Sequence, residues 1–309
     1  MKKRLLPLLL STALILPLLC PAAAAEETAT RRDLADALYA LANRPSVSQT
    51  QPYSDLTEAD DALHWISSEG YMVGYGSHQQ PAGTWSDDTS LVLATCDSIR
   101  EKGKIDLTDM QQRFKNWLFE GAYTPDGLTF DVGKATREAL TRGHGLSDEY
   151  SNGNGSLMRI LPLAFTEAGP SDVEAVSSIT HAHATSVEAC QLYVDIARRL
   201  LKGQQLSEIL SGLETSKTYA RLQTLAELTE DDIRSTGYVV DTLEAALWCL
   251  LTSTSYLETV LKAVNLGDDT DTVAAVAGGL AGIIYGLEGI PDNWLAQLRH
   301  KELLESCLF

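Results

Sequence analysis

The stretch that most restricts the possible folds is 267–282, where a dense acidic cluster opens an apolar segment rich in alanine and glycine. Three carboxylates and two hydroxyls occupy positions 268–272. Short oxygen side chains cap the first turn of a helix, and carboxylates are favoured at the positive end of the helix dipole. So dense a cluster repels itself unless a cation lies among the oxygens, and hard divalent cations such as Mg²⁺ prefer these ligands. The residues alone leave two alternatives open, helix capping without a metal and a metal site.

The segment after this cluster predicts a central, buried helix. Gly278, Gly279 and Gly282 lie within it, and each glycine costs about 1 kcal/mol of helix stability relative to alanine. That cost is understandable where a second helix backbone packs closely against the first. An acidic cluster at the end of a buried helix would form the floor of a site.

A second acidic cluster lies far upstream at 85–90, where Ser86, Asp87 and Asp88 precede the apolar run 91–96. This cluster also fits a helix start, because it combines hydroxyls and carboxylates directly before an apolar segment. Two such clusters could be brought together by a helical bundle. Together they would hold one or two metal ions.

Helical patterns cover most of the chain from residue 87 onward, without the sustained alternation that is typical of strands. Glycine, asparagine and aspartate mark loops at 121–130 and 143–155, and Asp106 and Asp131 stand where helix caps are expected. One all-α domain accounts for the pattern. The helices are predicted at 88–102, 106–119, 131–142, 155–168, 170–179, 184–202, 205–213, 216–227, 239–252, 255–265, 270–286 and 291–299.

The first residues, 1–25, predict a secretory signal peptide. A basic start at 2–4 precedes an apolar stretch at 5–19, and alanines at 22–25 supply small residues for cleavage. The apolar stretch is short for a membrane span, so we expect no span after cleavage and a protein that is secreted or held at the cell surface. Cys20 leaves lipidation open as an alternative.

The charge of the chain restricts its partners. The formal net charge is −18 at pH 7, which disfavours binding of nucleic acid through its phosphates. The four cysteines after the leader have no paired spacing typical of zinc or redox sites. We expect them as buried free thiols, although a disulfide stays possible in an exported protein.

The segment 26–72 predicts a small helix–loop–helix ahead of a larger domain at 73–309. It begins a first helix near Thr30, carries Ser54 and Asp55 in a loop with prolines, and places Trp65 in a second helix. This arrangement resembles one repeat of an S-layer homology domain. The resemblance implies contact with a cell-wall polymer. The alternative is that the two helices simply pack onto the larger domain.

Five motifs along the larger domain form a set. They lie at 81–90, 153–159, 180–183, 237–248 and 267–272. Together they resemble the ADP-ribosylglycohydrolase family, which includes the dinitrogenase reductase-activating glycohydrolase. The resemblance implies an all-α, orthogonal helical bundle of the ADP-ribosylglycohydrolase type.

The resemblance also implies a reaction, the metal-assisted hydrolysis of a glycosidic bond in ADP-ribosylated proteins or small ADP-ribose conjugates. Two Mg²⁺ or Mn²⁺ ions would orient the ribose hydroxyls and an attacking water. The implied metal ligands are Ser86, Asp87, Asp88, Asp269, Asp271 and Thr272. Catalysis is assigned to Asp87, Asp88 and Asp269, and the sequence leaves open which aspartate is the general base.

The loop at 151–156 is expected to bind the substrate. Its glycines let backbone amides approach an anion, although a loop of this composition alone is more often a simple turn. By resemblance it lines the pyrophosphate and distal ribose. Tyr238 either stacks on adenine or packs internally, and zinc binding by His181 and His183 is a weaker alternative because a third ligand is missing. The expected substrate-binding residues are Ser151, Gly153, Asn154, Gly155, Ser156, His181 and Tyr238.

A second hypothesis describes a catalytically impaired protein that keeps the fold and binds ADP-ribose or acts at the cell surface. Family members open with a Gly-Asp-Ala-Leu-Gly-like motif, and a nearby glutamate often takes part in their site. That motif is missing from 26–70, which favours the second hypothesis. The two retained acidic clusters favour the hydrolase.

Overall fold

The computed structural model describes residue 78 and residues 80–309. The predicted signal peptide at 1–25 and the S-layer-like segment at 26–72 lie outside the described residues, so both stay predictions. The described part of the chain is built from helices and loops without strands, and two isolated bridges join Leu146 to His181 and Gly153 to Tyr238. The predicted all-α class is confirmed.

The helices follow one another along the chain, and the longest connections are at 121–133 and 143–156. The α-helices are α4 (Asp87–Lys102), α5 (Leu107–Glu120), α6 (Lys134–Arg142), α7 (Pro170–Ser177), α8 (Ala184–Leu201), α9 (Leu206–Ser211), α10 (Val239–Leu251), α11 (Tyr256–Asn265), α12 (Thr270–Tyr285), α13 (Asp292–Gln297) and α14 (Lys301–Cys307). The 3₁₀ helices are η2 (Leu157–Arg159), η3 (Leu161–Phe165), η4 (Lys217–Glu227), η5 (Glu230–Asp232) and η6 (Leu287–Gly289).

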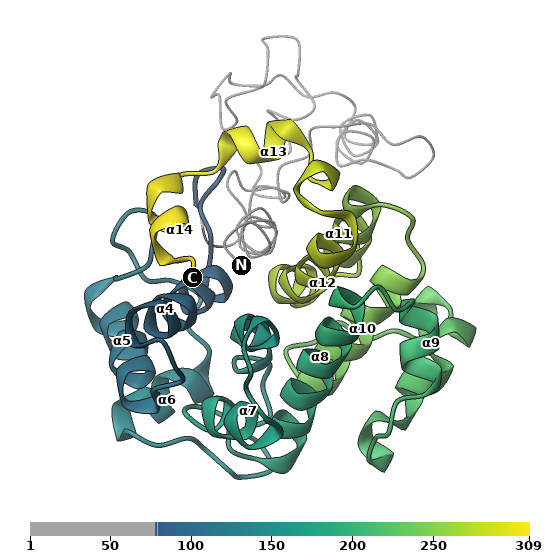
Figure 1. Ribbon diagram of the computed structural model, residues 1–309, viewed down its shortest axis with the longest axis horizontal. Helices are drawn as coiled ribbons and strands as arrows, with labels where there is room; N and C mark the ends of the chain where they lie inside the picture. The colour runs from purple at the N-terminus through teal and green to yellow at the C-terminus, as the bar shows by residue number, and fades with distance from the viewer. Residues whose placement is uncertain (1–77, 79) are drawn as a thin grey trace, which may run out of the picture. The chain divides into compact units, whose positions relative to one another are not determined.

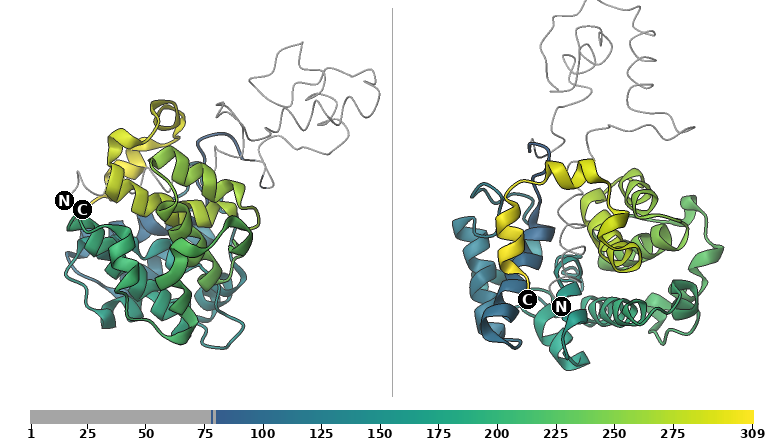
Figure 2. Two further views of the ribbon diagram at one scale, coloured as in Figure 1. Left: turned by 90° about the vertical axis from the view of Figure 1, so that its right-hand side faces the viewer. Right: turned by 45° about the horizontal axis from the view of Figure 1, so that its top comes forward.

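Helix α12 lies inside the bundle, as its composition predicts. It packs against α8, α10 and α11 (Figures 1 and 2), and every residue from Thr272 to Gly282 is buried. The Tyr193 hydroxyl of α8 donates a hydrogen bond of 2.7 Å to the Val276 carbonyl. A helix surrounded on several sides fixes its own N-terminus within the bundle, because its axis cannot shift without disturbing each neighbour.

Helix α4 is the second buried helix that begins with an acidic cluster. It packs against α5, α14 and η2, and it also contacts α12. The apolar residues from Leu91 to Ala94 are fully buried. The direct contact between α4 and α12 relates the two acidic clusters in space, although they are far apart in the sequence.

Several predicted boundaries need correction. The helix expected at 155–168 is instead the two 3₁₀ helices η2 and η3, because Pro162 near the start of η3 has no N–H group and disfavours helical geometry before it. The helix expected at 216–227 is 3₁₀ as well, with a kink at Thr224. The Asp106 cap is confirmed, since its carboxylate accepts a 3.1 Å hydrogen bond from the Asp109 amide.

The C-terminal segment packs against the loop that leads into α4. The Arg299 amide donates a 3.2 Å hydrogen bond to the Gly83 carbonyl, and the Arg299 guanidinium donates one of 2.9 Å to the Thr84 hydroxyl. A Cβ atom on Gly83, whose φ is +78°, would stand 1.8 Å from the Gln297 carbonyl oxygen. Helix α14, which was not predicted, covers α4 with Leu304.

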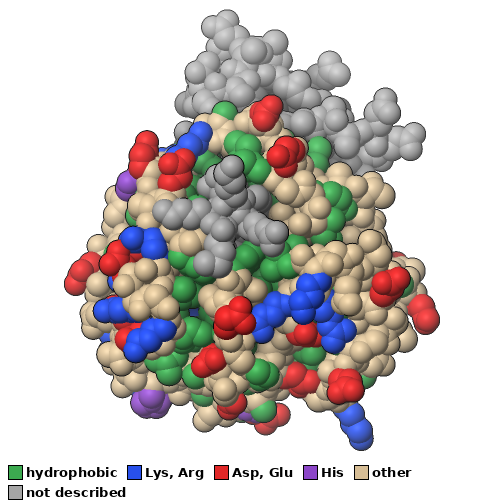
Figure 3. Space-filling model, in the orientation of Figure 1, with side chains coloured by type: hydrophobic (Ala, Val, Ile, Leu, Met, Phe, Trp, Pro, Cys, Tyr) green, Lys and Arg blue, Asp and Glu red, His purple; other side chains and the backbone are tan. Residues whose placement is uncertain are grey.

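The cysteines agree with the expectation from composition. Acidic and basic side chains are interspersed over the described residues of the face in Figure 3. Within the described residues, no helix has the length and apolarity needed to cross a membrane. Four cysteines are buried free thiols: Cys96, Cys190, Cys249 and Cys307.

Candidate active site

The first acidic cluster lies at the start of α4. Ser86 is the N-cap residue, and Asp87 and Asp88 form the first turn. All three side chains are buried. The Ser86 hydroxyl donates a 2.8 Å hydrogen bond to a carboxylate oxygen of Asp88, so its only proton is not directed at a helix carbonyl or at solvent. The two carboxylates are thereby held in the interior, where uncompensated charge is costly.

The second acidic cluster lies at the start of α12. Asp269 is the N-cap residue, and Asp271 and Thr272 belong to the first turn. The chain reaches this position through Gly267 at φ +90° and Asp268 at φ +51°, a left-handed turn that glycine and aspartate adopt more readily than other residues. The turn directs Asp269 and Asp271 into the bundle and leaves Asp268 exposed.

The N-cap side chains at the starts of α4 and α12 do not cap their helices. Neither N-cap side chain, Ser86 nor Asp269, makes a hydrogen bond to a backbone amide of its helix. By contrast, Asp106 at the start of α5 and Ser255 at the start of α11 both cap in the ordinary way. The chain therefore caps helices elsewhere and directs the oxygens of its two acidic clusters toward each other.

The two clusters meet. The pKa of Asp87 is raised well above its ordinary value, first by burial and then by Asp88, Asp131, Asp271 and Asp269. Each of those four carboxylates must therefore lie near Asp87. Burial is also the largest cause at Asp88, where Asp271 and Asp269 add to the effect. This group of five carboxylates, Asp87, Asp88, Asp131, Asp269 and Asp271, is called the acidic cluster below.

Within the acidic cluster, neighbouring carboxylates compete for protons. The pKa of Asp269 is raised to about 6, first by burial and then by Asp271. The pKa of Asp271 is also raised to about 6, first by burial and then by Asp131. Asp131 and Asp269 both act on the pKa of Asp271, so these carboxylates lie close to it. Carboxylates buried together disfavour one another's charged form, and a nearby positive charge would relieve this.

The donor set fits a hard divalent cation. As they stand, no three acidic, histidine or cysteine side chains of the described residues surround one point closely enough to hold an ion. One carboxylate oxygen of Asp88 and one of Asp271 are nevertheless buried without a hydrogen-bond partner among those residues. A buried acceptor without a partner is costly, and a cation would satisfy both oxygens. Oxygen donors of this kind suit Mg²⁺ or Mn²⁺ rather than zinc.

Asp131 is the site residue that the sequence did not predict. It was expected as the N-cap of a helix at 131–142, but α6 begins at Lys134 with Gly133 at its N-cap. Asp131 has a left-handed φ of +54° and joins the acidic cluster instead. An aspartate before a helix usually caps it, so the sequence pattern carries no signal that separates this role from capping.

The loop at 151–156 is fixed to the segment that contains Tyr238. The Asn154 amide donates a 3.1 Å hydrogen bond to the Gly237 carbonyl, and the Val239 amide donates one of 3.0 Å to the Asn152 carbonyl. The Ser151 hydroxyl donates to Asp148 at 2.7 Å. These bonds hold the loop in one conformation without the help of a regular strand.

Asn154 connects this loop to the acidic cluster. Its side-chain amide donates hydrogen bonds to Asp269 at 2.8 Å and to the Thr242 hydroxyl at 3.0 Å. Gly237 adds a close approach, because a Cβ atom there would lie 3.0 Å from the Asp269 carboxylate. The loop and the acidic cluster are therefore in direct contact through Asn154 and Gly237.

The remaining predicted binding residues differ in accessibility. Ser156 is fully buried, and its hydroxyl contacts Ser177 at 3.0 Å and Cys190 at 3.4 Å, so a ligand would reach only its backbone. Tyr238 is 43% exposed beside the loop, which leaves its ring accessible for stacking and argues against a packing role. His183 accepts a 3.2 Å hydrogen bond from the Thr185 amide and thereby caps α8, which argues against zinc.

His181 lies beneath the loop. Its ring is buried, and its Nε2 edge faces the glycines, since a Cβ atom on Gly153 would lie 3.6 Å from Nε2 and one on Gly155 would lie 3.5 Å from it. Burial and the neighbouring Arg159 lower the pKa of His181 to about 3. The imidazole is therefore neutral at physiological pH.

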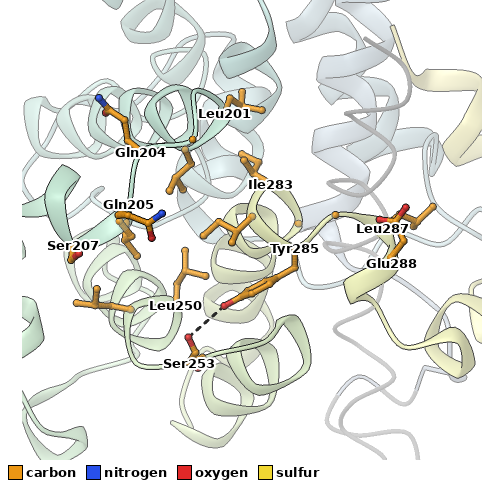
Figure 4. A pocket seen from close by; sticks show the side chains of 17 residues that line it. Leu201, Gln204, Gln205, Ser207, Leu250, Ser253, Ile283, Tyr285, Leu287 and Glu288 are labelled. Atoms are coloured by element: carbon orange, nitrogen blue, oxygen red, sulfur yellow. Dashed lines mark hydrogen bonds between the residues drawn. The ribbon is translucent and has the colours of Figure 1, made fainter.

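A large pocket lies elsewhere and does not supply this chemistry. It has a volume of about 990 Å³ and lies at the C-terminal ends of α10 and α12, near Tyr285 and Gln204 (Figure 4). Among the described residues that line it, Glu288 is the only charged one. The acidic cluster is at the opposite end of α12, about 24 Å away along an axis of 16 residues.

The chain matches the family model described as ADP-ribosylglycohydrolase over residues 22–308. That range includes the segment 26–72, for which the S-layer resemblance stays a prediction. A solved structure titled as an ADP-ribosylglycohydrolase-related protein complex is similar over 99% of this chain and 97% of that chain, with a TM-score of 0.65 and 28% identity.

Two curated relatives are similar over most of their length. An ADP-ribosylarginine hydrolase of Pseudomonas putida is 37% identical over 257 residues, which cover 77% of this chain and 69% of the relative. The ADP-ribosyl-[dinitrogen reductase] glycohydrolase of Rhodospirillum rubrum is 30% identical over 247 residues, which cover 74% of this chain and 79% of the relative.

Proposed function

Since the chain belongs to the ADP-ribosylglycohydrolase family, we propose that it is an exported, metal-dependent enzyme that releases ADP-ribose from arginine. Membership in this family makes the chain an ADP-ribosyl hydrolase. The observation that supports the finer proposal is the acidic cluster, where the starts of α4 and α12 meet beside the loop at 151–156.

The metal ligands would come from both helix starts. Ser86, Asp87 and Asp88 would contribute from α4, and Asp269, Asp271 and Thr272 from α12. When bound, Mg²⁺ or Mn²⁺ would stabilise negative charge and lower the pKa of a coordinated water. The partnerless oxygens of Asp88 and Asp271 support this assignment.

We assign the general base to Asp131. This carboxylate lies beside Asp87 and Asp271 but outside the proposed ligand set, so it can accept a proton without giving up a bond to the metal. The oxygen of the attacking water bonds to the anomeric carbon of the ribose, and the proton passes to Asp131. The carbon–nitrogen bond breaks, and its electron pair leaves with the guanidine nitrogen.

Asp131→Asn tests this assignment. It keeps the size of the side chain but cannot accept the proton. We expect kcat to fall by about 100-fold or more while ADP-ribose binding in the presence of Mg²⁺, measured by calorimetry, changes little. An unchanged kcat would assign the base to another carboxylate.

Arginine is the proposed acceptor amino acid because two relatives of the chain are ADP-ribosylarginine hydrolases, from Pseudomonas putida and Serratia proteamaculans. A peptide ADP-ribosylated on arginine and one modified on serine provide the test. We expect faster release of ADP-ribose from the arginine peptide. The opposite preference would leave the hydrolase intact and overturn the linkage.

Export is proposed from the basic, apolar and small-residue pattern at 2–25. Expression of the full chain in a bacterial host and N-terminal sequencing of the product would test it. We expect cleavage near residue 25 and recovery outside the cytoplasm. An uncleaved chain in the cytoplasm would contradict the proposal.

Removal of the proposed ligands is the central test. In the presence of Mg²⁺, Asp87→Ala and Asp269→Ala should each lower ADP-ribose release by about 100-fold or more. Asp195→Ala is a matched control, because this aspartate on α8 is half-exposed and pairs with Arg199 away from the acidic cluster. If both cluster variants keep full activity, the metal-site assignment is wrong.

Metal dependence has its own measurement. Chelation with EDTA should abolish ADP-ribose release, and Mg²⁺ or Mn²⁺ should restore it. Activity that survives chelation would contradict the metal proposal. Calorimetry with ADP-ribose and Mg²⁺ then separates the impaired alternative, for which we would expect binding without turnover.

A further inference from the structure

Thr180 connects two buried side chains beneath the substrate loop. Its hydroxyl oxygen lies 2.8 Å from Nδ1 of His181 and accepts a 2.9 Å hydrogen bond from the Arg159 guanidinium. All three residues are buried, with Arg159 and Thr180 at 0% and His181 at 1% exposure. Water therefore does not compete for these bonds, and their direction is decided by the protein.

Arg159 is a buried cation whose charge has no carboxylate partner among the described residues. The same guanidinium nitrogen donates to the Val176 carbonyl at 3.1 Å, and the group lies 4.6 Å from the centroid of the Phe114 ring, a cation–π contact that offsets part of the cost of burial. Burial lowers the pKa of Arg159 to about 10, so the group stays protonated at neutral pH. It can only donate, and Thr180 must accept.

The direction of the hydrogen bond between Thr180 and His181 follows from that of the bond between Arg159 and Thr180. A threonine hydroxyl has one proton, and among the described residues Nδ1 of His181 is the only acceptor in contact with Thr180. If Nδ1 carried the imidazole proton instead, the Thr180 proton would be buried without an acceptor, which costs about 1–3 kcal/mol. The hydroxyl therefore donates to Nδ1, and the neutral imidazole carries its proton on Nε2.

The protonated nitrogen faces the loop that is expected to bind the substrate. A Cβ atom on Gly155 would stand 2.9 Å from Cε1 of His181, and one on Gly153 would stand 3.6 Å from Nε2. No described residue forms a hydrogen bond with Nε2. Glycine at both positions lets the loop backbone approach the ring closely, which places the Nε2 edge of His181 directly against the loop that is expected to bind the substrate.

We propose that Arg159 and Thr180 are positioning residues that hold His181 in the Nε2–H tautomer, so that it presents a neutral hydrogen-bond donor to an oxygen of the bound ADP-ribose. The inference rests on the proposed function only for the identity of the ligand. A fixed neutral donor has a physical advantage next to the acidic cluster, because it needs no protonation and keeps its role across the pH range in which the carboxylates titrate.

The backbone around His181 supports the same role. The His181 amide donates a 2.9 Å hydrogen bond to the Ser177 carbonyl, and the Leu146 amide donates one of 3.0 Å to the Thr180 carbonyl. Main chain and side chain are therefore fixed together. Rotation of the ring about its Cβ–Cγ bond would break the contact of Nδ1 with Thr180, so the hydroxyl fixes the direction of Nε2 as well as its proton.

Nuclear magnetic resonance of the full chain labelled with ¹⁵N-histidine tests the tautomer directly. The imidazole nitrogens have distinct chemical shifts when protonated and unprotonated, and His181→Gln identifies the signals. At pH 7 and without any ligand, we expect an unprotonated Nδ1 and a protonated Nε2. A proton on Nδ1 in the wild-type protein would overturn the proposal.

Substitutions at Thr180 separate positioning from simple packing. Thr180→Val removes the hydroxyl at nearly constant volume, so we expect a mixture of tautomers and ADP-ribose binding, in the presence of Mg²⁺, that is weaker by about 2- to 10-fold. Thr180→Ser keeps the hydroxyl and should restore both. Thr259→Val is the matched control, because Thr259 on α11 is equally buried and its hydroxyl bonds to the Ser255 carbonyl at 2.8 Å.

Arg159→Lys and Arg159→Met provide an independent pair. Lysine keeps a cationic donor to Thr180 and should keep His181 in the Nε2–H tautomer. Methionine removes the donor, so we expect a mixture of the two His181 tautomers. If Thr180→Val keeps both the tautomer and the affinity of the wild type, the proposal is wrong. If the wild-type protein shows the Nε2–H tautomer but binds no ADP-ribose, the proposed function is wrong. The role of Arg159 and Thr180 in holding the tautomer of His181 would still be supported.

Discussion

At the scale of the residue, the carboxylates of the acidic cluster repel one another, and a bound cation would relieve this repulsion. Five carboxylates in and around the starts of α4 and α12 raise one another's pKa values, with burial as the first cause. Protein stability is therefore lost where the function is concentrated, a trade-off that is common in active sites. This leads to a prediction in which stability and activity change in opposite directions.

Asp269→Asn should stabilise the metal-free protein while it abolishes hydrolysis. The pKa of Asp269 is raised to about 6 in the folded chain from 3.8. Its contribution to stability is complete below pH 3.8 and is lost as the pH rises through 6. At pH 7.5 the variant should gain about 1–3 kcal/mol in the free energy of unfolding, measured by urea denaturation with EDTA present. A destabilised variant at pH 7.5, or a gain of the same size at pH 4, would contradict this account.

His181 should make the protein less stable in mild acid. Its pKa is lowered from 6.5 to about 3 by burial and then by Arg159, so stability is complete above pH 6.5 and is lost as the pH falls toward 3. Between pH 7 and pH 5 the loss is about 2 kcal/mol. The measurement is the difference between wild type and His181→Gln at each pH, because the carboxylates titrate in both. Equal pH dependence in the two proteins would show that His181 is not buried as a neutral ring.

The sequence predicts the residues of the two acidic stretches but not their fifth partner. Ser86, Asp87 and Asp88 carry a visible signal, because their density exceeds what a helix cap requires. Asp131 stands alone before a helix, where the same residue type usually caps. Its left-handed backbone depends on the packing of the loop around it, which no local pattern contains.

At the scale of the element, the loop at 151–156 is held in the site by specific hydrogen bonds, although it is not a regular helix. Its amides and glycines are held by 237–239, and Asn154 joins it to α12 through Asp269. A methyl group on Gly155 would lie 2.7 Å from the Thr136 hydroxyl and 2.9 Å from the His181 ring. A side chain at position 155 would therefore fit only if the loop, Thr136 or His181 shifted.

Gly155→Ala should weaken ADP-ribose binding by about tenfold or more, because the added methyl group displaces the loop from the His181 ring. Gly212→Ala is the control, since a Cβ atom there would meet its nearest neighbour at an ordinary 3.6 Å and the backbone is not left-handed. Calorimetry of both variants with Mg²⁺ and ADP-ribose provides the comparison. Equal affinities would show that the loop does not contact the ligand.

Long helices follow from the sequence because each repeats its pattern over several turns. α4, α8, α10, α11 and α12 begin and end within about two residues of their predicted limits. The 3₁₀ segments η2, η3 and η4 do not follow, since their apolar spacing over a few residues resembles that of an α-helix. Helix α14 was missed because His300, in a left-handed conformation, separates it from α13.

At the scale of the whole molecule, the site depends on both ends of the described domain. Residues 297–299 pack on Gly83 and Thr84, directly before Asp87 and Asp88 of the acidic cluster. Helix α14 packs against α4. The position of Asp87 and Asp88 is therefore set partly by residues at the C-terminus.

Leu304→Ala should destabilise the protein by about 2–4 kcal/mol and reduce activity with it, because Leu304 is buried against α4. Glu305→Ala changes the exposed neighbour on the same helix and should have little effect. Thermal denaturation and a turnover assay of both variants test the prediction. A stable but inactive Leu304→Ala protein would indicate that α14 acts on the site by a route other than packing.

The bond between Thr84 and Arg299 joins residues that are 215 positions apart in the chain, and it has a consequence for synthesis. When α4 through α11 have been translated, three of the five carboxylates of the acidic cluster exist, and Asp269, Asp271 and the 297–299 segment have not yet been made. The acidic cluster and the contact that supports the start of α4 can therefore assemble only after residues 269–299 have been translated.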